Sequence, residues 1–162
     1  MLINDYILEI KNLNACEEAV KDAHNFKTSK KLWTACVRGD WMLWLIGRTI
    51  DRSNEVALRK LTLVKARCAK LVIHLMKDER SRKAVEVAER FGLGQATRDE
   101  LDTSAADASA ADADAAYAAY AAAAYAAYAA AYAARAKTLQ QCADIIRTEY
   151  PNVDELFKEK KC

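Results

Sequence analysis

The chain has 162 residues, of which 25 are basic and 23 acidic, so its formal net charge is only +2. That length fits one domain on the usual scale of roughly 100–200 residues, and the near balance of charge does not indicate a nucleic-acid partner. Glycine (4 residues) and proline (1 residue) are scarce, which argues against the many turns of a β-sandwich. Because Ala, Leu, Lys, Arg and Glu all favour helix, the composition predicts an all-α fold. We expect a single-domain helical bundle over residues 1–162, with about six to seven helices.

The cysteine content and the lack of long apolar runs indicate the compartment. Five cysteines are present and none forms a C-x-x-C pair. Four lie among apolar or alanine positions, which predicts buried reduced thiols: Cys16, Cys36, Cys68 and Cys142. No signal peptide is recognisable, and the longest dense apolar run, residues 41–46, is far shorter than the roughly 20 residues of a membrane span. We therefore expect a soluble cytoplasmic protein with no membrane partner.

The N-terminal part of the chain predicts three short helices. Residues 4–13 carry apolar side chains at helical spacing, and residues 14–26 repeat the pattern with Asn14 as the expected N-cap. A third, short helix is expected to open at Thr28 and Ser29.

A glycine separates these helices from a very apolar one. Gly39 interrupts the helical pattern, and Asp40 is the expected N-cap of the next helix. That helix opens with Trp41-Met42-Leu43-Trp44-Leu45-Ile46, which is apolar nearly all round. A helix of this kind is buried on most sides, so we expect it to be the core helix of the bundle.

Two further helices are predicted in the middle of the chain. Ser53 is the expected cap of a helix that runs to about Lys77, with apolar residues along one side. Asp78 or Ser81 is expected to start the next helix. Gly92 lies where a left-handed residue commonly follows a helix end, so it is the expected stop.

The last predicted helix is very long. Thr97-Arg98-Asp99-Glu100 has the T-x-x-E pattern of a capping box. Neither glycine nor proline occurs from 101 to 150, and an unbroken helix over that range would be about 75 Å long. A domain of this size has a radius of gyration near roughly 15 Å, so we expect a break within 103–114, where Ser and Asp compete for the backbone. Pro151 ends the helix.

An alanine- and tyrosine-rich segment, residues 110–136, is the most unusual feature. On a continuous helix its tyrosines and two charged residues fall within an arc of about 140° on one face. These residues, here called the tyrosine face, are Asp114, Tyr117, Tyr120, Tyr125, Tyr128, Tyr132 and Arg135. Alanine on the other face lets a second helix approach closely. Two interpretations stay open: the rings fill gaps in the bundle, or the tyrosine face is an exposed partner-binding surface, since Tyr and Arg are enriched in binding hot spots.

Catalytic and metal-binding motifs are not recognisable in the sequence. His24 and His74 have no Cys, Asp or His at a spacing that would form a zinc-ligand set. Nucleophile-elbow, P-loop and dinucleotide-binding motifs do not occur. A dyad of Cys36 with His74 stays open, and the basic residues within 59–70 are interpreted as a solvated helix face. We expect no catalytic residue, no metal and no cofactor.

One block of the sequence resembles a known family. The stretch Ala35-Cys36-Val37-Arg38-Gly39-Asp40-Trp41-Met42-Leu43-Trp44-Leu45 resembles a signature of the bacterial and phage immunity-protein family. Other features follow in a similar order: an early Cys-Glu-Glu-Ala helix at 16–20, a Trp-containing turn at 32–33, an Ala/Tyr-rich helix, and a Cys-Ala-Asp-Ile-Ile-Arg block that leads to Tyr150-Pro151. The likeness covers most of residues 14–151. It implies a protein that neutralises a partner toxin in bacterial competition, and it implies no catalytic residue.

The leading hypothesis is a non-enzymatic immunity or inhibitor protein that binds and neutralises a partner protein such as a toxin. Arg38, Asp40 and Trp41 are then either partner-binding residues or structural parts of a capped core helix. The second hypothesis is a phage counter-defence protein that inhibits a host defence nuclease or sequesters a signalling nucleotide, and the third is an enzyme with an unrecognised helical active site. A deep polar pocket holding Arg and Tyr would favour nucleotide capture or catalysis over surface blocking. A nucleotide ligand and a homo-oligomer both stay open.

Overall fold

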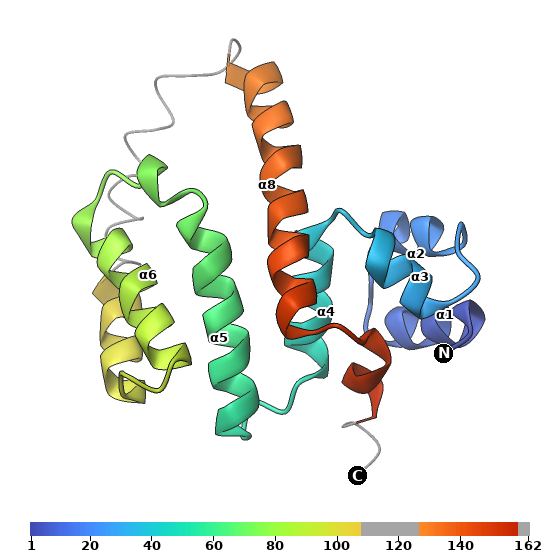
Figure 1. The fold of residues 1–162 in the computed structure, drawn as a ribbon, viewed down its shortest axis with the longest axis horizontal. Coiled ribbons are helices and arrows are strands. Elements are labelled where there is room, and N and C mark those ends of the chain that lie inside the picture. The colour runs from blue at the N-terminus through green and yellow to red at the C-terminus, as the bar shows by residue number, and fades with distance from the viewer. Residues whose placement is uncertain (108–126, 159–162) are drawn as a thin grey trace. The chain divides into compact units, whose positions relative to one another are not determined.

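The computed structural model describes residues 1–107 and 127–158, with the backbone alone for 127–134 (Figure 1). Apart from one isolated bridge between Leu2 and Thr28, the regular structure in these ranges is helical, which confirms the all-α class. The chain divides into two compact units, Met1–Asn54 with Leu139–Cys162, and Glu55–Thr138. The single-domain expectation stays a prediction. Within the described ranges, no helix combines the length and the apolar character that crossing a bilayer requires.

The first unit contains helices from both ends of the chain. They are α1 (Ile3–Asn12), α2 (Glu17–Ala23), α3 (Ser29–Ala35), α4 (Gly39–Thr49), the part of α8 (Ala127–Glu149) from Leu139 on, and the 3-10 helix η2 (Val153–Phe157). η2 packs against α3 and α4. The shared core is apolar and includes Ile7, Ile10, Leu32, Trp33, Met42, Leu45, Ile46, Ala143, Ile146, Val153 and Phe157. The three predicted N-terminal helices and the core helix are therefore present.

The turn between α1 and α2 shows that the expected cap at Asn14 is wrong. Asn14 has a φ of 62°, a left-handed conformation that asparagine tolerates better than most side chains. Its N–H donates to the Lys11 carbonyl at 2.9 Å, and the Ala15 N–H donates to the Ile10 carbonyl at 3.0 Å. This pair of bonds is a Schellman motif. Asn14 therefore ends α1, and the N-cap of α2 is Cys16.

The start of α4 is set by a close approach to α8. A Cβ on Gly39 would lie 2.5 Å from the Cβ of Cys142 and 2.7 Å from the Leu139 carbonyl oxygen, so this packing has room only for glycine. The N-cap of α4 is Arg38, with no side-chain cap bond. The expected N-cap role of Asp40 is therefore wrong. Asp40 lies in the first turn of α4, where a carboxylate stabilises the positive end of the helix dipole.

Long-range hydrogen bonds join α3 to the C-terminal segment. The buried indole Nε1 of Trp33 donates to the Tyr150 carbonyl at 2.7 Å. Arg147 donates to the Cys36 carbonyl at 2.7 Å and to the Trp33 carbonyl at 3.2 Å. These carbonyls belong to the last turn of α3, whose groups have no partner within the helix. The bonds therefore fix the end of α3 and the short connection that leads into α4.

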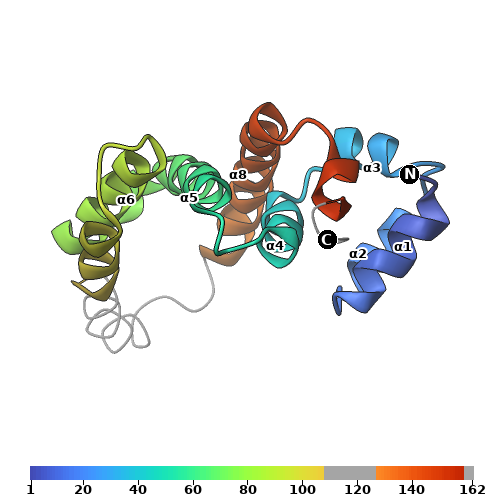
Figure 2. The ribbon, with the colours of Figure 1, turned by 90° about the horizontal axis from the view of Figure 1, so that it is seen from below.

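The second unit is built on α5 (Glu55–Lys70) and α6 (Glu79–Gly92), which lie side by side in Figures 1 and 2. α5 ends well before the predicted Lys77. The N–H groups of residues 71–72 bond to carbonyls three residues back instead of four, and the 3-10 helix η1 (Ile73–Leu75) follows. The tighter i to i+3 pattern is typical of a helix that is ending.

The two ends of α6 test one cap prediction each. Asp78 is the N-cap, and its side chain accepts the Arg80 N–H at 2.8 Å, as predicted. The expected stop at Gly92 is wrong, because Gly92 is still helical and Gly94 is the left-handed residue, with a φ of 77°. The Gln95 N–H donates to the Arg90 carbonyl at 2.7 Å, which again is the Schellman pattern.

Gly92 is needed for packing rather than for a turn. A Cβ there would lie 2.5 Å from the Cβ of Leu63 on α5. Beside it, Phe91 is 1% exposed, and the Arg59 guanidinium lies 4.3 Å from the centre of its ring. Arg59 also donates to the Phe91 carbonyl at 2.6 Å. Phe91 shares its core cluster with Val87, Ala96, Leu58 and Leu101.

The predicted capping box is present. The Thr97 N–H donates to the Glu100 carboxylate at 2.7 Å, and the Glu100 N–H donates to the Thr97 hydroxyl oxygen at 3.2 Å. Helix follows over 98–107. The predicted break within 103–114 is therefore absent from 103–107, and the rest of that range lies outside the described residues.

The C-terminal helix is described from Ala127 on. α8 ends at Glu149, as predicted from Pro151. Most of the alanine- and tyrosine-rich segment 110–136 precedes this helix and lies outside the described residues. A long helix continuous from 101 to 150 stays a prediction.

Of the four cysteines that the structure describes, three are buried. Cys36, Cys68 and Cys142 are buried as predicted, whereas Cys16 is exposed and corrects that expectation. Cys16 precedes the first turn of α2, and the neighbouring Glu17 and Glu18 are exposed too. The apolar spacing of α2 therefore does not extend back to its N-cap.

The exposure of the thiols predicts a difference in reactivity. Burial raises the pKa of the Cys36 thiol, which lowers the thiolate fraction at neutral pH and so slows alkylation. We expect iodoacetamide to modify Cys16 at least about tenfold faster than Cys36 in the folded protein at pH 7.5. Mass spectrometry of proteolytic peptides measures both rates. Equal rates in the folded protein would contradict the burial of Cys36, and equal rates in urea serve as the control.

Candidate functional site

The three motif residues at the start of α4 form one cluster. The Arg38 guanidinium donates to both carboxylate oxygens of Asp40, at 2.9 and 2.7 Å. Its carbon Cζ also lies 4.1 Å from the centre of the Trp41 ring, which is a cation–π arrangement. The side chains of Arg38 and Asp40 are 34% and 36% exposed. Arg38, Asp40 and Trp41, here called the Arg–Trp cluster, are thus ordered and accessible at the same time.

Within the Arg–Trp cluster, Arg38 and Asp40 each stabilise the charged form of the other. Hydrogen bonds from Arg38 hold the pKa of Asp40 below its usual value, more strongly than partial burial raises it. The same bonds raise the pKa of Arg38. The ion pair therefore survives mild acid, and its stabilisation is lost only as the pH falls through the lowered Asp40 pKa.

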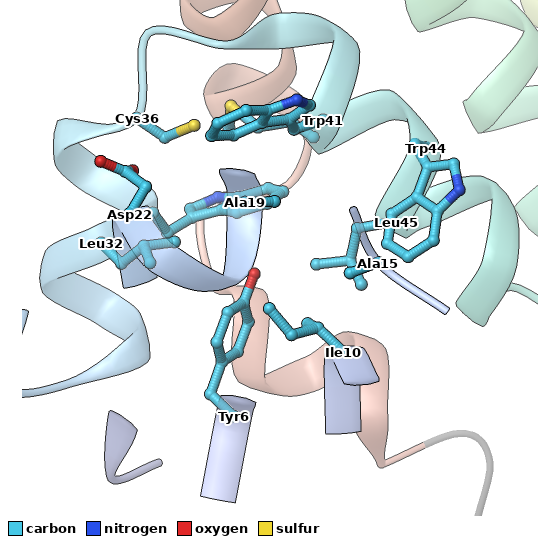
Figure 3. A pocket seen from close by; sticks show the side chains of 12 residues that line it. Tyr6, Ile10, Ala15, Ala19, Asp22, Leu32, Cys36, Trp41, Trp44 and Leu45 are labelled. Atoms are coloured by element: carbon cyan, nitrogen blue, oxygen red, sulfur yellow. The ribbon is translucent and has the colours of Figure 1, made fainter. Parts of the chain in front are cut away.

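A pocket lies next to this cluster in the first unit. It encloses about 430 Å³ including its open mouth and is lined by side chains of α1, α2, α3 and α4 and of their connections (Figure 3). Most of the lining is apolar or aromatic: Ile10, Ala15, Ala19, Leu32, Trp33, Trp41, Met42, Trp44 and Leu45. Small residues at 15 and 19 leave the space that the large rings across from them do not fill.

Three polar side chains also line the pocket: Tyr6, Asp22 and Cys36. The Tyr6 ring lies edge-on to Phe157, and its hydroxyl points into the pocket (Figure 3). Burial, with a smaller effect of Cys36, raises the pKa of Tyr6 well above its ordinary value, so the phenol stays neutral. The Cys36 thiol donates to the Arg38 carbonyl at 3.7 Å. Cys36 therefore links the pocket to the Arg–Trp cluster.

The tyrosine face is only partly described. Arg135 is exposed on α8, and Tyr128 and Tyr132 lie in the same helix, with side chains outside the described residues. Asp114, Tyr117, Tyr120 and Tyr125 lie outside the described residues altogether. The partner-binding interpretation of this face stays a prediction.

The remaining sequence predictions concern the two histidines and a metal site. His24 and His74 are both exposed. Across residues 1–107 and 127–158, no group of three His, Cys, Asp or Glu side chains could hold a metal ion. Sequence reasoning identified the Arg–Trp cluster but not the pocket, because Tyr6 and Asp22 look like ordinary helix positions until four helices meet.

Comparison with known proteins finds no family model, no curated protein and no solved structure that matches this chain. The resemblance to the immunity-protein family therefore stays a prediction that rests on residues 14–151 alone. Function has to be inferred from the geometry of the Arg–Trp cluster and of the pocket beside it.

Proposed function

We propose that this chain is a non-enzymatic binding protein of the immunity or inhibitor type, which neutralises a partner protein such as a toxin by covering part of its surface. The connection from α3 to α4 forms the contact surface. It includes the Arg–Trp cluster and the adjoining Val37. The tyrosine face is a second proposed contact, for which Arg135 is the exposed residue on α8.

The stacking of Arg38 on Trp41 is the observation that carries the proposal. Arginine and tryptophan are two of the three residue types most enriched in binding hot spots. Here the guanidinium is held by the ring and by both oxygens of Asp40, so little side-chain freedom remains to be lost on binding. Val37 is 52% exposed directly beside them. An exposed apolar residue next to an ordered Arg and Trp suits a protein contact better than a solvated surface.

The pocket gives no support to nucleotide sequestration. Binding a phosphate requires basic side chains or a helix N-terminus aimed at it. None of the residues that line the pocket is basic, and one of them, Asp22, is acidic. Inhibition of a defence nuclease is a case of partner binding, so the identity of the partner decides between a toxin and a nuclease.

Co-expression with a toxic protein encoded by a neighbouring gene tests the proposal. We expect the wild-type chain to restore growth and to form a stable complex with the toxic protein after purification. Val37→Asp places a charge in the proposed contact and should lower survival by about tenfold or more. Val56→Asp is the matched control, since Val56 is 77% exposed on α5. Both variants must keep the wild-type helical circular dichroism.

The outcomes separate clearly. Loss of protection in Val37→Asp alone supports the surface at the α3–α4 connection. Equal protection by both variants would place the contact elsewhere. A wild-type chain that neither protects nor binds the neighbouring gene product would overturn the proposed function.

A further inference from the structure

We propose that the pocket of the first unit is a binding site for a small organic amine that carries a second polar group on an apolar body. The pocket shares Trp41 with the proposed protein contact, but the inference does not depend on that function. It follows from two polar side chains that lack partners and from the aromatic walls around them.

Tyr6 supplies one polar group. The residue is only 5% exposed, and its hydroxyl points into the pocket (Figure 3). Among the described residues, its side chain contacts the Phe157 ring and has an electrostatic interaction with Cys36, and neither is a hydrogen bond to the hydroxyl. The hydroxyl oxygen is not fully buried and faces the open space of the pocket, where a ligand donor or acceptor can replace water as its hydrogen-bond partner.

Asp22 supplies the charge. It is half-buried on α2, and no ion pair to its carboxylate occurs among the described residues. Its charge acts on the Cys36 thiol, and Figure 3 shows the Asp22 carboxylate on the same side of the pocket as Cys36. A partly desolvated carboxylate without a counter-ion favours a cation. The absence of basic lining residues means that no protein side chain competes for this role.

The walls determine what lies between the two polar groups. Trp41 and Trp44 line the pocket together with Ile10 and Leu45. Such walls bind a flat apolar body, and tryptophan rings also attract an ammonium group. The volume of about 430 Å³ includes the open mouth, so the enclosed part of the pocket is smaller and suits only a compact ligand. The fitting chemistry is a compact aromatic amine.

Three related ligands separate the contribution of the amine from that of the phenol hydroxyl. Tyramine has an amine and a phenol at opposite ends of one ring, phenethylamine lacks the phenol hydroxyl, and tyrosol has an alcohol in place of the amine. Calorimetry and tryptophan fluorescence of the full chain measure each affinity at pH 7. We expect tyramine to bind at least about tenfold more tightly than tyrosol, and several-fold more tightly than phenethylamine.

Two variants assign these differences to residues. Asp22→Asn should remove the preference for tyramine over tyrosol and leave tyrosol binding unchanged. Tyr6→Phe should remove the preference for tyramine over phenethylamine. Because the Tyr6 hydroxyl has no hydrogen bond to lose, Tyr6→Phe should also keep or raise the melting temperature of the ligand-free protein. Asp5→Asn, which alters an exposed carboxylate of α1, is the control and should change nothing.

Several results would overturn the proposal. One is the absence of saturable binding of tyramine up to about 10 mM. Another is a preference for tyramine over tyrosol that persists in Asp22→Asn, because a residue other than Asp22 would then bind the amine. Equal affinity for all three probes would mean that the pocket binds apolar rings and recognises neither polar group.

Discussion

Gly39→Ala is expected to lower the free energy of unfolding by about 3 kcal/mol, at the upper end of the usual cost of overpacking a core. The new methyl group would meet the Cβ of Cys142 at 2.5 Å, and two of its three close neighbours are backbone atoms of α8, which cannot rotate away. α4 and α8 would have to move apart. Urea unfolding followed by circular dichroism measures the change.

The control for this variant lies in the same helix. Gly47 is also in α4, and a Cβ there would meet nothing within 4 Å. Gly47→Ala should therefore stabilise the protein by roughly 0.5–1 kcal/mol, because alanine loses less backbone entropy in a helix. Two glycine-to-alanine changes in one helix are thus expected to act with opposite signs. If Gly39→Ala were neutral or stabilising, the close approach of α4 and α8 would be contradicted.

Phe91→Ala is expected to have the largest effect in the second unit, about 3–5 kcal/mol of lost stability. The ring is 1% exposed, so its removal leaves a cavity between α5 and α6. Arg59 would also lose the ring that it covers at 4.3 Å. Urea unfolding monitored by circular dichroism, together with hydrogen exchange of peptides from 55–107, measures the loss.

Leu93→Ala is the matched control for Phe91→Ala. Leu93 follows two residues later and is 50% exposed, so its truncation should change stability by less than about 0.5 kcal/mol. Similar losses in both variants would mean that Phe91 is not the centre of this core. A small effect of Phe91→Ala alone would lead to the same conclusion.

Several local signals were predicted correctly from the sequence, although the N-cap predictions at Asn14 and Asp40 were wrong. The helix start at Thr28, the cap at Asp78 and the reciprocal bonds of Thr97 with Glu100 are present. Each depends on atoms only two or three residues apart, so the sequence contains everything that decides it. The all-α class follows equally from composition, because scarce glycine and proline leave few other options.

Features that depend on distant residues were predicted poorly. Gly39 and Gly92 look like helix stops, yet both are helical, and each is required by a neighbouring helix, at Cys142 and at Leu63. Periodicity alone cannot show which glycine faces a partner helix and which ends a turn. Asn14 was misassigned because asparagine is favoured in two different places. Its side chain suits the start of a helix, and its tolerance of a left-handed φ suits the position just after a helix end.

The sequence predicted the Arg–Trp cluster of the candidate site but not the pocket beside it. Arg38, Asp40 and Trp41 stand together in the sequence, and the structure brings their side chains into one cluster. The pocket needs Tyr6 from α1 and Asp22 from α2 to meet the tryptophans of α4. No local pattern identifies a cavity, because its existence depends on how completely four helices fill the space between them.

Hydrogen exchange of this chain in complex with a toxic protein encoded by a neighbouring gene tests most directly whether the partner contacts the start of α4. We expect binding to slow exchange in peptides that cover residues 36–44, where Val37 and the Arg–Trp cluster lie, and to leave α5 and α6 unchanged. Slowed exchange confined to α5 and α6, with residues 36–44 exchanging as in the isolated protein, would contradict a partner contact at the start of α4.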